Sequence, residues 1–356
     1  MVHRSSVLWA IANSIAPSLE TNERLTPTDS NERKADLTYC ANHLRTRSTA
    51  WVVDCEHLPS LTAYFDPSTV TKKVARRLNE SSCRAVFYWS KKSLENCALT
   101  LRNNFPANKS HVVYPAVMPS TGHRDRNNFD GKVRICHVST VRNSYFENMS
   151  NFLVKGTRDL LLILKLLAQK HPQLTRKLVV TVRAWCPQNL VSELRAKGVN
   201  LQLIQSEMSR SEVLSLLSDS DLGVVPCHST PTMSFIEAMS RGVPVITNDV
   251  WANSEYVSDE RSGLIIQPPS SVKYNDSLLN PLWYRPGFME KLRKTVDREY
   301  LQRHVSAIAS LVEDEGRLFS LKKTTEEYFK KSEFEAYTRN QWVGTLLDQA
   351  AGCSTI

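Results

Sequence analysis

Short apolar runs alternate with amphipathic stretches along most of this 356-residue chain, and this alternation constrains the fold more than any other feature. Many of the runs are continuously apolar, as expected for parallel strands that are covered on both faces. A strand, a helix and another strand, repeated, predict an α/β fold with doubly wound parallel sheets. The predicted strands are residues 51–54, 85–89, 111–114, 133–138, 178–182, 201–204, 222–226, 243–247 and 264–267. The predicted helices are residues 91–101, 157–170, 188–196, 211–218 and 231–241.

Length and one polar segment predict two domains. Domains usually hold about 100–200 residues, so a chain of this length suggests two. The segment at 118–132 is polar, contains Pro and Gly and shows no periodicity, which marks it as the boundary. We expect an N-terminal domain at 1–122, a C-terminal domain at 131–325 and a helical tail at 326–356.

Composition excludes several classes of protein. The chain is 41% apolar and 23% charged, which suits a globular core rather than a disordered chain. The apolar stretch at 7–12 is shorter than the ~20 residues of a membrane span and the ~7 of the shortest signal-peptide core. None of the eight cysteines forms a C-x-x-C pair, so reduced, buried thiols are expected. Together these features favour a cytoplasmic protein.

Local signals mark the ends of two predicted helices. Ser209 and Glu212 form a capping box before an apolar run. Thr230 places a capping hydroxyl before Pro231, which we expect at the first helical position, and Gly242 is expected to close that helix in a left-handed conformation.

The segment at 222–267 reads as strand, capped helix, strand, loop and strand. Its helix begins directly after a strand end, where open α/β sheets bind ligands. The N-terminus of a helix offers N–H groups and a positive dipole end, which suit a phosphate. Glu237 lies within this helix, where a carboxylate can accept hydrogen bonds from two ribose hydroxyls.

The string FIEAMSRGVPVIT at 235–247 resembles the Glu-Ala-Met-x-x-Gly-x-Pro-Val-Ile signature of family 4 of the retaining nucleotide-sugar glycosyltransferases, which have the GT-B fold. The later Ser254-Glu255 and Ser262-Gly263-Leu264 resemble further elements of that family, and NFLVKG at 151–156 resembles its Lys-Gly donor-phosphate element. The resemblance covers roughly residues 50–330. It implies two Rossmann-like domains that face a cleft, with the tail crossing back onto the N-terminal domain through Trp342, Leu346 and Leu347.

The resemblance also implies a reaction. A hexose would move from a UDP- or GDP-linked nucleotide-diphosphate sugar to a glycan, a lipid-linked acceptor or another hydroxyl. No Asp-x-Asp pair suited to a divalent ion stands out, so we expect metal-independent chemistry without a cofactor.

Residue roles follow from the same resemblance. The catalytic set would be His57, Lys155, Arg142 and Glu237, with Arg158 as a rival to Arg142 for the donor phosphates. Donor contacts would come from Ser229, Thr232, Met233, Ser234 and Met208, although capping explains Ser229 and Thr232 equally well and loop structure explains Met208. Asp54 and Glu56 lie at the carboxyl end of the predicted strand at 51–54, on the acceptor side. For His57 the alternative is a structural histidine at a strand end.

Two departures from the family pattern stand out. The family pairs two glutamates separated by seven residues, and here Ser229 occupies the first position. A serine lacks a carboxylate's charge and its two acceptor oxygens, so a weak or inactive module that binds a nucleotide sugar or a protein is the alternative. Arg142 precedes Lys155 by thirteen residues, and an insertion at 143–151 explains the gap.

Charge is concentrated at residues 71–110. Nine basic residues against two acidic ones give this segment +7 of the net +9. Lys72 with Arg76, and Lys73 with Arg77, share one helix face. Anionic lipids attract such clusters, so we expect peripheral contact with the inner face of a membrane; a solvated basic face is the alternative. Despite a pI near 9.1, no nucleic-acid-binding motif is present, so we do not expect a nucleic-acid partner.

Overall fold

The computed structural model describes residues 37–42, 44, 50–61, 67–119, 129–142, 144–272, 274, 286–336, 343–344, 346–347 and 350. These residues form two compact units: one holds residues up to 114 and those from 343 onward, and the other holds 115–274 and 286–336. The division at Tyr114 falls a few residues before the polar segment in which we expected it. Helix α15 (Glu315–Lys330), which contains the expected start of the tail at 326, belongs to the second unit.

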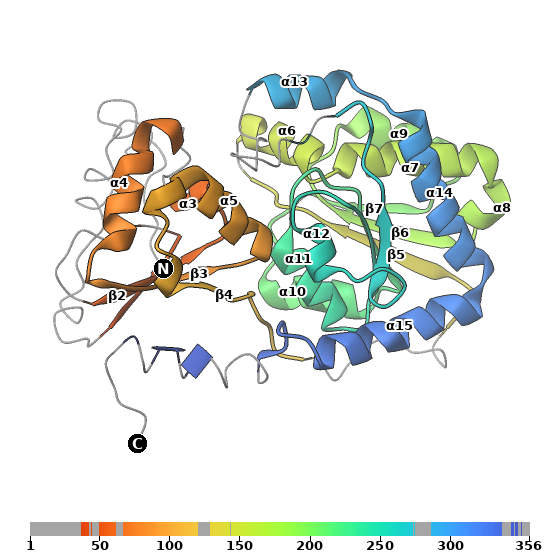
Figure 1. Cartoon of the computed structure of the whole chain (residues 1–356). Helices are drawn as coiled ribbons and strands as arrows, with labels where there is room; N and C mark the ends of the chain where they lie inside the picture. Colours follow the sequence, from red (N-terminus) through yellow and green to blue (C-terminus); the bar gives the residue numbers. More distant parts are fainter. Residues whose placement is uncertain are drawn as a thin grey trace. The chain divides into compact units, whose positions relative to one another are not determined.

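The first unit is a four-stranded parallel sheet in the order β1-β2-β3-β4 (Figure 1). Its strands are β1 (Thr38–Ala41), β2 (Trp51–Cys55), β3 (Cys83–Tyr88) and β4 (Ser110–Val112). Its helices are α3 (Leu58–Leu61), α4 (Pro67–Asn79) and α5 (Lys91–Leu101), followed by the 3-10 turns η2 (Arg102–Asn104) and η3 (Ala107–Lys109). The sequence did not predict β1, because only Cys40 of its four residues is buried and no apolar pattern marks it.

Both faces of the first sheet are covered. Trp51, Val53 and Cys55 of β2 pack with residues of α4 and α5, while Val52 points to the other face. There Val52 and Val343, from the C-terminal segment, belong to one apolar cluster. Leu346 and Leu347 also pack against this cluster. The C-terminal residues therefore complete the core of the first unit; Trp342 lies outside the described residues.

The second unit is a six-stranded parallel sheet in the order β10-β9-β8-β5-β6-β7. Helix α7 contacts both α9 and α14 on one face, and α10, α11 and α15 lie on the other (Figure 1). Its strands are β5 (Val133–Val138), β6 (Leu178–Arg183), β7 (Leu201–Ile204), β8 (Leu222–Val225), β9 (Val245–Asn248) and β10 (Gly263–Ile266). Its helices are α6 (Tyr145–Val154), α7 (Thr157–Lys170), α8 (Pro172–Thr175), α9 (Gln188–Ala196), α10 (Arg210–Ser218), α11 (Thr232–Met239), α12 (Asn253–Tyr256), α13 (Pro286–Lys294), α14 (Arg298–Glu313) and α15.

The two parallel sheets with helices confirm the predicted doubly wound α/β class. Every predicted strand and helix overlaps an observed one. In the second unit the sequence did not predict the short helices α8 and α12. Nor did it predict α6, which begins inside the expected insertion at 143–151. It reverses the usual pattern, because Tyr145 and Phe146 are 60% and 83% exposed while Asn148 is buried.

Candidate active site

The site of the second unit lies at the carboxyl ends of β5 and β8. These strands are neighbours in the sheet. From β5 the chain adds β6 and β7 on one side of β5, and it then crosses over to add β8, β9 and β10 on the other side. The order of the strands thus reverses between β5 and β8. Ligands of open α/β sheets bind at such a switch point, outside the carboxyl ends of the strands.

A left-handed glycine places Lys155 at this point. Gly156 has φ of +78°, and a Cβ atom built on it would lie 2.1 Å from the carbonyl oxygen of Pro226, directly after β8. The backbone N–H of His228 donates to the carbonyl of Val154 at 2.8 Å. The turn between α6 and α7 is therefore pressed against the end of β8, and only glycine fits there.

Lys155 ends helix α6 and is half-buried. Burial raises the pKa of the neighbouring Cys227 thiol, and the positive charge of Lys155 opposes that shift. The ammonium group therefore lies near the loop that leaves β8.

Helix α11 begins on the same loop. Its cap is Pro231, and helical geometry begins at Thr232, so the predicted first position is wrong by one residue. The predicted Thr230 cap is also wrong: no side chain caps α11, and the Thr230 hydroxyl instead accepts from the N–H of Ala252 at 3.2 Å. The predicted left-handed Gly242 is present with φ of +62°.

Glu237 lies on the partly exposed side of α11 together with Met233 and Ser234, whereas Thr232 is buried. At 1.5 Å per residue, Glu237 is about 8 Å along the axis from the start of the helix. Its carboxylate oxygen Oε1 lies 3.2 Å from Nε of Arg210, at the start of α10. Burial raises the pKa of Glu237, and Arg210 and Arg241 oppose the rise.

Ser229 lies between β8 and α11 and is fully buried. Its hydroxyl has no hydrogen-bond partner among the described residues. A buried hydroxyl without a partner costs about 1–3 kcal/mol, which is tolerated most readily where a ligand supplies the partner.

The two candidate arginines differ in their engagement. Arg142 follows β5 and is exposed, and its guanidinium makes no hydrogen bond or ion pair with a described residue. Arg158, on α7, donates to the backbone carbonyls of Leu292 and Thr295, which fastens the end of α13. Because the guanidinium of Arg158 already donates to two backbone carbonyls, Arg142 is the better candidate for binding a ligand phosphate.

Met208 is half-buried in the loop after β7. It lies at the carboxyl edge of the same sheet, but β5 and β6 separate its strand from β8. The predicted capping box follows it and is present, with Ser209 and Glu212 bonded reciprocally.

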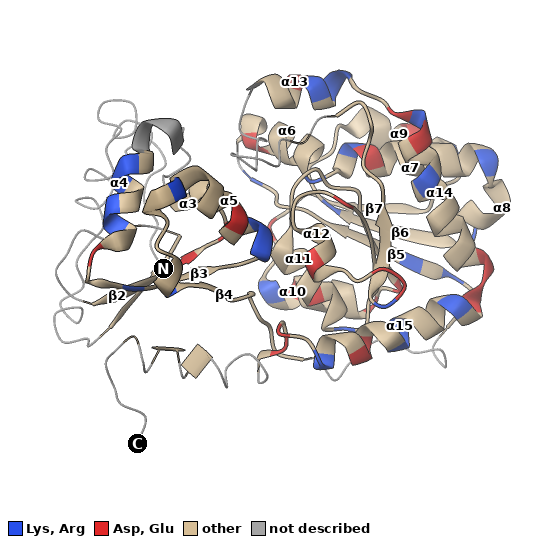
Figure 2. Ribbon diagram, viewed as in Figure 1, with Lys and Arg blue, Asp and Glu red and all other residues tan. Residues whose placement is uncertain are grey.

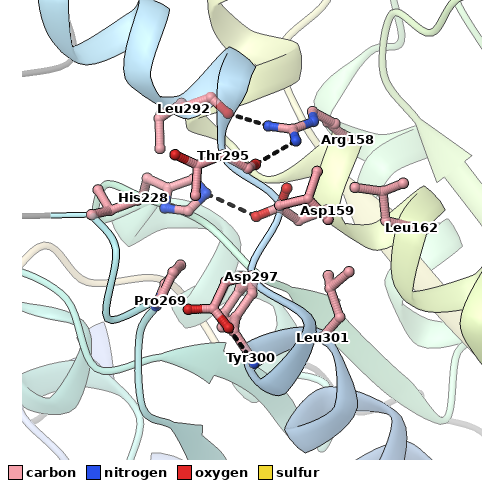
Figure 3. Close-up of a pocket in the computed structure, with 12 residues that line it drawn as sticks. Arg158, Asp159, Leu162, His228, Pro269, Leu292, Thr295, Asp297, Tyr300 and Leu301 are labelled. Atoms are coloured by element: carbon pink, nitrogen blue, oxygen red, sulfur yellow. Dashed lines mark hydrogen bonds and ion pairs between the residues drawn. The ribbon is translucent and has the colours of Figure 1, made fainter.

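Sequence reasoning missed a buried polar network beneath the loop. Nε2 of His228 lies 2.9 Å from Oδ2 of Asp159, and Nδ1 of His228 lies 2.6 Å from the hydroxyl of Tyr274. Figure 3 shows the first of these bonds at a small pocket between α7 and α14. The pocket has room for about one water molecule, whereas ligand sites usually hold about 300–1,000 Å³. The network therefore holds the β8 loop in place rather than a substrate.

A second missed contact fastens β5 to β8. Nδ1 of His137 lies 2.9 Å from the carbonyl oxygen of Val224, and Nε2 lies 2.9 Å from the hydroxyl of Thr157. Because a carbonyl oxygen only accepts, Nδ1 carries the proton and Nε2 accepts from the hydroxyl. Burial lowers the pKa of His137 to about 4, so the ring is neutral at pH 7. The only signal in the sequence is a histidine inside an apolar strand.

Asp54, Glu56 and His57 lie together at the end of β2 in the first unit. The carboxylate of Asp54 accepts from the Tyr39 hydroxyl at 2.8 Å, the Asn42 N–H at 2.7 Å and the Trp89 indole at 3.2 Å.

His57 is 1% exposed, and its Nδ1 accepts from the N–H of Ser60 at 3.1 Å. Because Nδ1 accepts, the neutral ring carries its proton on Nε2. Glu56 is half-buried and donates its N–H to Oδ1 of Asn42 at 2.9 Å.

No three His, Cys, Asp or Glu side chains among the described residues are grouped closely enough to hold a metal ion. Among the described helices, none combines the length and apolar character needed to cross a bilayer.

Residues 145–281 match the family model of the glycosyl transferases group 1. No curated protein sequence matches the chain. Several solved structures match most of it. HepE from Anabaena, in complex with UDP and glucose, has a TM-score of 0.58 at 14% identity, over 95% of this chain and 83% of HepE.

A glycosyltransferase from Rickettsia africae has a TM-score of 0.56 at 12% identity, over 98% of this chain and 84% of that one. WaaG, a glycosyltransferase of lipopolysaccharide biosynthesis, has a TM-score of 0.55 at 13% identity, over 91% and 79%. At these identities the likeness shows the fold, which is GT-B. The match at 145–281 indicates a glycosyltransferase.

Proposed function

We propose that this chain is a retaining glycosyltransferase of family 4 that moves a hexose from a UDP- or GDP-linked sugar to a hydroxyl of a glycan, a lipid-linked or another acceptor, without a metal ion. The observation that carries the proposal is the meeting of Lys155 and the start of α11 at the end of β8, where β5 and β8 form the switch point. The Anabaena structure with UDP and glucose supports the choice of donor.

The proposed chemistry breaks the bond between the anomeric carbon of the sugar and the diphosphate oxygen. The bonding electrons leave with the diphosphate, the acceptor oxygen bonds to the anomeric carbon, and the acceptor proton passes to the departing phosphate. Lys155, Arg142 and the first N–H groups of α11 (Thr232, Met233 and Ser234) stabilise the charge that develops on that phosphate.

Binding roles complete the proposal. Glu237 accepts hydrogen bonds from the ribose hydroxyls, and the Ser229 hydroxyl pairs with a hydroxyl of the donor sugar, which would satisfy its buried oxygen. Met208 lines the pocket for the nucleobase. In the first unit, His57 contacts the acceptor and the transferred sugar, with Asp54 and Glu56 fixing the loop around it.

The second candidate function is a weak or inactive module that binds a nucleotide sugar or a protein partner. Ser229 favours it, since a neutral hydroxyl stands where the family has a glutamate. Both candidates require binding of a nucleotide, and only the first requires transfer.

Two measurements test the proposal in sequence. Thermal shifts with UDP, GDP and their sugars should identify a nucleotide that raises the melting temperature, and the absence of any shift would reject both candidates. Release of UDP or GDP from the matching sugar should then be detectable and lost in Glu237→Ala and Lys155→Ala. Binding without release or transfer, tested over a panel of glycan and lipid-linked acceptors, would favour the second candidate.

We also propose that the first unit contacts anionic membranes from the cytoplasmic side through the basic segment at 71–110. Lys72, Lys73 and Arg76 are exposed on α4. Figure 2 shows that basic residues follow one another along this helix. Arg77 is engaged in an ion pair with Glu80 at 2.8 Å, so it contributes less to such a surface.

Vesicle flotation tests this contact. At about 1 kcal/mol per basic residue, Lys72→Ala/Lys73→Ala/Arg76→Ala should bind phosphatidylserine vesicles about 100-fold more weakly than the wild type. The control Arg176→Ala/Lys177→Ala/Lys197→Ala removes the same charge from exposed sites of the second unit. Equal recovery of the two variants, or equal binding to neutral vesicles, would reject a specific membrane face.

A further inference from the structure

Helix α6 separates Arg142 from Lys155 by thirteen positions, yet both flank the switch point of the second sheet. We infer that Asn148, buried on α6, is a positioning residue that fixes Arg142 for the donor diphosphate. This inference rests on the proposed function, because it assigns Arg142 an anionic ligand.

Asn148 binds both polar backbone groups of Arg142. Its Oδ1 accepts from the Arg142 N–H at 2.8 Å, and its Nδ2 donates to the Arg142 carbonyl at 2.6 Å. Asn148 is 6% exposed, so little water competes for these bonds. A side-chain amide bonded in this way fixes the peptide groups on both sides of the Arg142 Cα atom, as a neighbouring strand would.

The rest of α6 is anchored independently. Asn151 donates to the carbonyl of Thr140 at 3.3 Å, which adds a third bond to the same loop. Phe152 packs edge-on against Trp185, which follows β6, with ring centroids 5.7 Å apart. Lys155 ends the helix. One rigid helix therefore connects the two basic residues, and the Asn148 bonds determine where the first of them leaves the backbone.

The surroundings of Arg142 suit an anion. Its side chain is exposed, and the second arginine nearby is Arg183, at the end of β6. Burial lowers the pKa of Arg183 and the positive charge of Arg142 lowers it further, while Glu207 opposes both. The charges of Arg142 and Arg183 repel each other; Glu207 offsets part of this repulsion, and an anion bound beside Arg142 would offset more of it.

The experiment measures UDP binding by calorimetry, with GDP in parallel, for the wild type, Asn148→Ala, Arg142→Ala and the double variant. We expect Kd to rise about 10-fold in Asn148→Ala and about 30-fold in Arg142→Ala, because misplacing a phosphate contact costs nearly as much as deleting it. If Asn148 acts through Arg142, the double variant should lie within about 2-fold of Arg142→Ala.

The control Asn189→Ala changes an exposed asparagine of α9 and should leave Kd unchanged. A second control variant tests whether weaker binding comes from a general loss of structure in α6. Asn151→Ala removes one bond of the same helix to the same loop but none to Arg142, so its effect on Kd should be less than about 3-fold.

Each result decides the inference. Wild-type Kd in Asn148→Ala, or fold-changes that multiply in the double variant, would overturn it while leaving the proposed function intact. If Asn148→Ala is too unstable for calorimetry, Asn148→Gln keeps a neutral amide but lengthens the side chain by one methylene group, which should misplace both bonds to Arg142, and the same criteria apply to it. A wild type that binds neither UDP nor GDP would overturn the proposed function, and the inference with it.

Discussion

At the end of β2 in the first unit, Asp54 and Ser60 are bonded to neighbouring protein groups, whereas three buried side-chain oxygens at strand ends of the second unit have no hydrogen-bond partner among the described residues. In the first unit Asp54 accepts three hydrogen bonds, and the Ser60 hydroxyl lies 2.8 Å from Oδ1 of Asn42. In the second unit the buried side-chain oxygens of Ser139, Ser229 and Asn248 have no partner among the described residues. The difference teaches that polar side chains at a strand end can serve two purposes: they can hold their own loop in place, or they can bind a ligand.

The largest expected effect tests how tightly the turn between α6 and α7 packs against the end of β8. Gly156→Ala brings a Cβ atom to 2.1 Å from the Pro226 carbonyl oxygen at φ of +78°. We expect a loss of about 3 kcal/mol or more in the free energy of unfolding, measured by urea denaturation. The control Gly198→Ala has φ of +81° and open space around its Cβ, so it should cost only about 1 kcal/mol. Equal costs would show that the close approach to β8 is not needed.

The next effect concerns activity rather than stability. Lys155→Ala should lower donor turnover about 100-fold while shifting the melting temperature little, because the charge on the leaving group loses its partner. The matched control is Lys197→Ala, since Lys197 ends α9 as Lys155 ends α6, with nearly the same φ and ψ. If both variants keep wild-type turnover, the proposed role of the second unit in the transfer reaction is rejected.

A smaller effect is expected from pH. Burial lowers the pKa of His304 to about 4 from 6.5, so the folded state binds fewer protons than the unfolded state between these values. Stability should therefore rise with pH over this window and be lost as pH falls through it. His304→Leu should remove about 2 kcal/mol of the loss between pH 7 and pH 4.5, compared by urea denaturation. An unchanged pH dependence would place the acid sensitivity elsewhere.

The smallest effect separates the two kinds of strand end directly. Ser60→Ala removes a hydroxyl that lies within hydrogen-bonding distance of two oxygens and should cost about 1 kcal/mol in unfolding free energy. Ser229→Ala removes a buried hydroxyl without a partner, so stability should stay the same or rise. The same change should weaken binding of UDP-glucose about 5-fold, and of UDP hardly at all. The comparison fails if Ser229→Ala is the more destabilising of the two.

Much of the fold could be predicted from the residues because the core strands are continuously apolar. In the second unit the strand ranges agree to within one or two residues, and the capping box at Ser209 is present. The Thr230 cap failed because a tertiary contact, the N–H of Ala252, competes for its hydroxyl. Helix α6 was missed because it exposes aromatic residues and buries Asn148, which reverses the pattern that sequence reasoning relies on.

The amino-acid order alone determined the parallel α/β class and placed Ser229 in the loop, and Glu237 in the helix, that follow the predicted strand at 222–226, since burial periodicity and turn residues are local properties. Tertiary structure alone decided which of these strand ends are neighbours, which arginine is engaged by backbone carbonyls, and which buried oxygens have no partner. Those answers depend on contacts between segments distant in the chain, such as Gly156 against Pro226 and His228 against Asp159. No local pattern records them, because their free energy arises only when the sheet assembles.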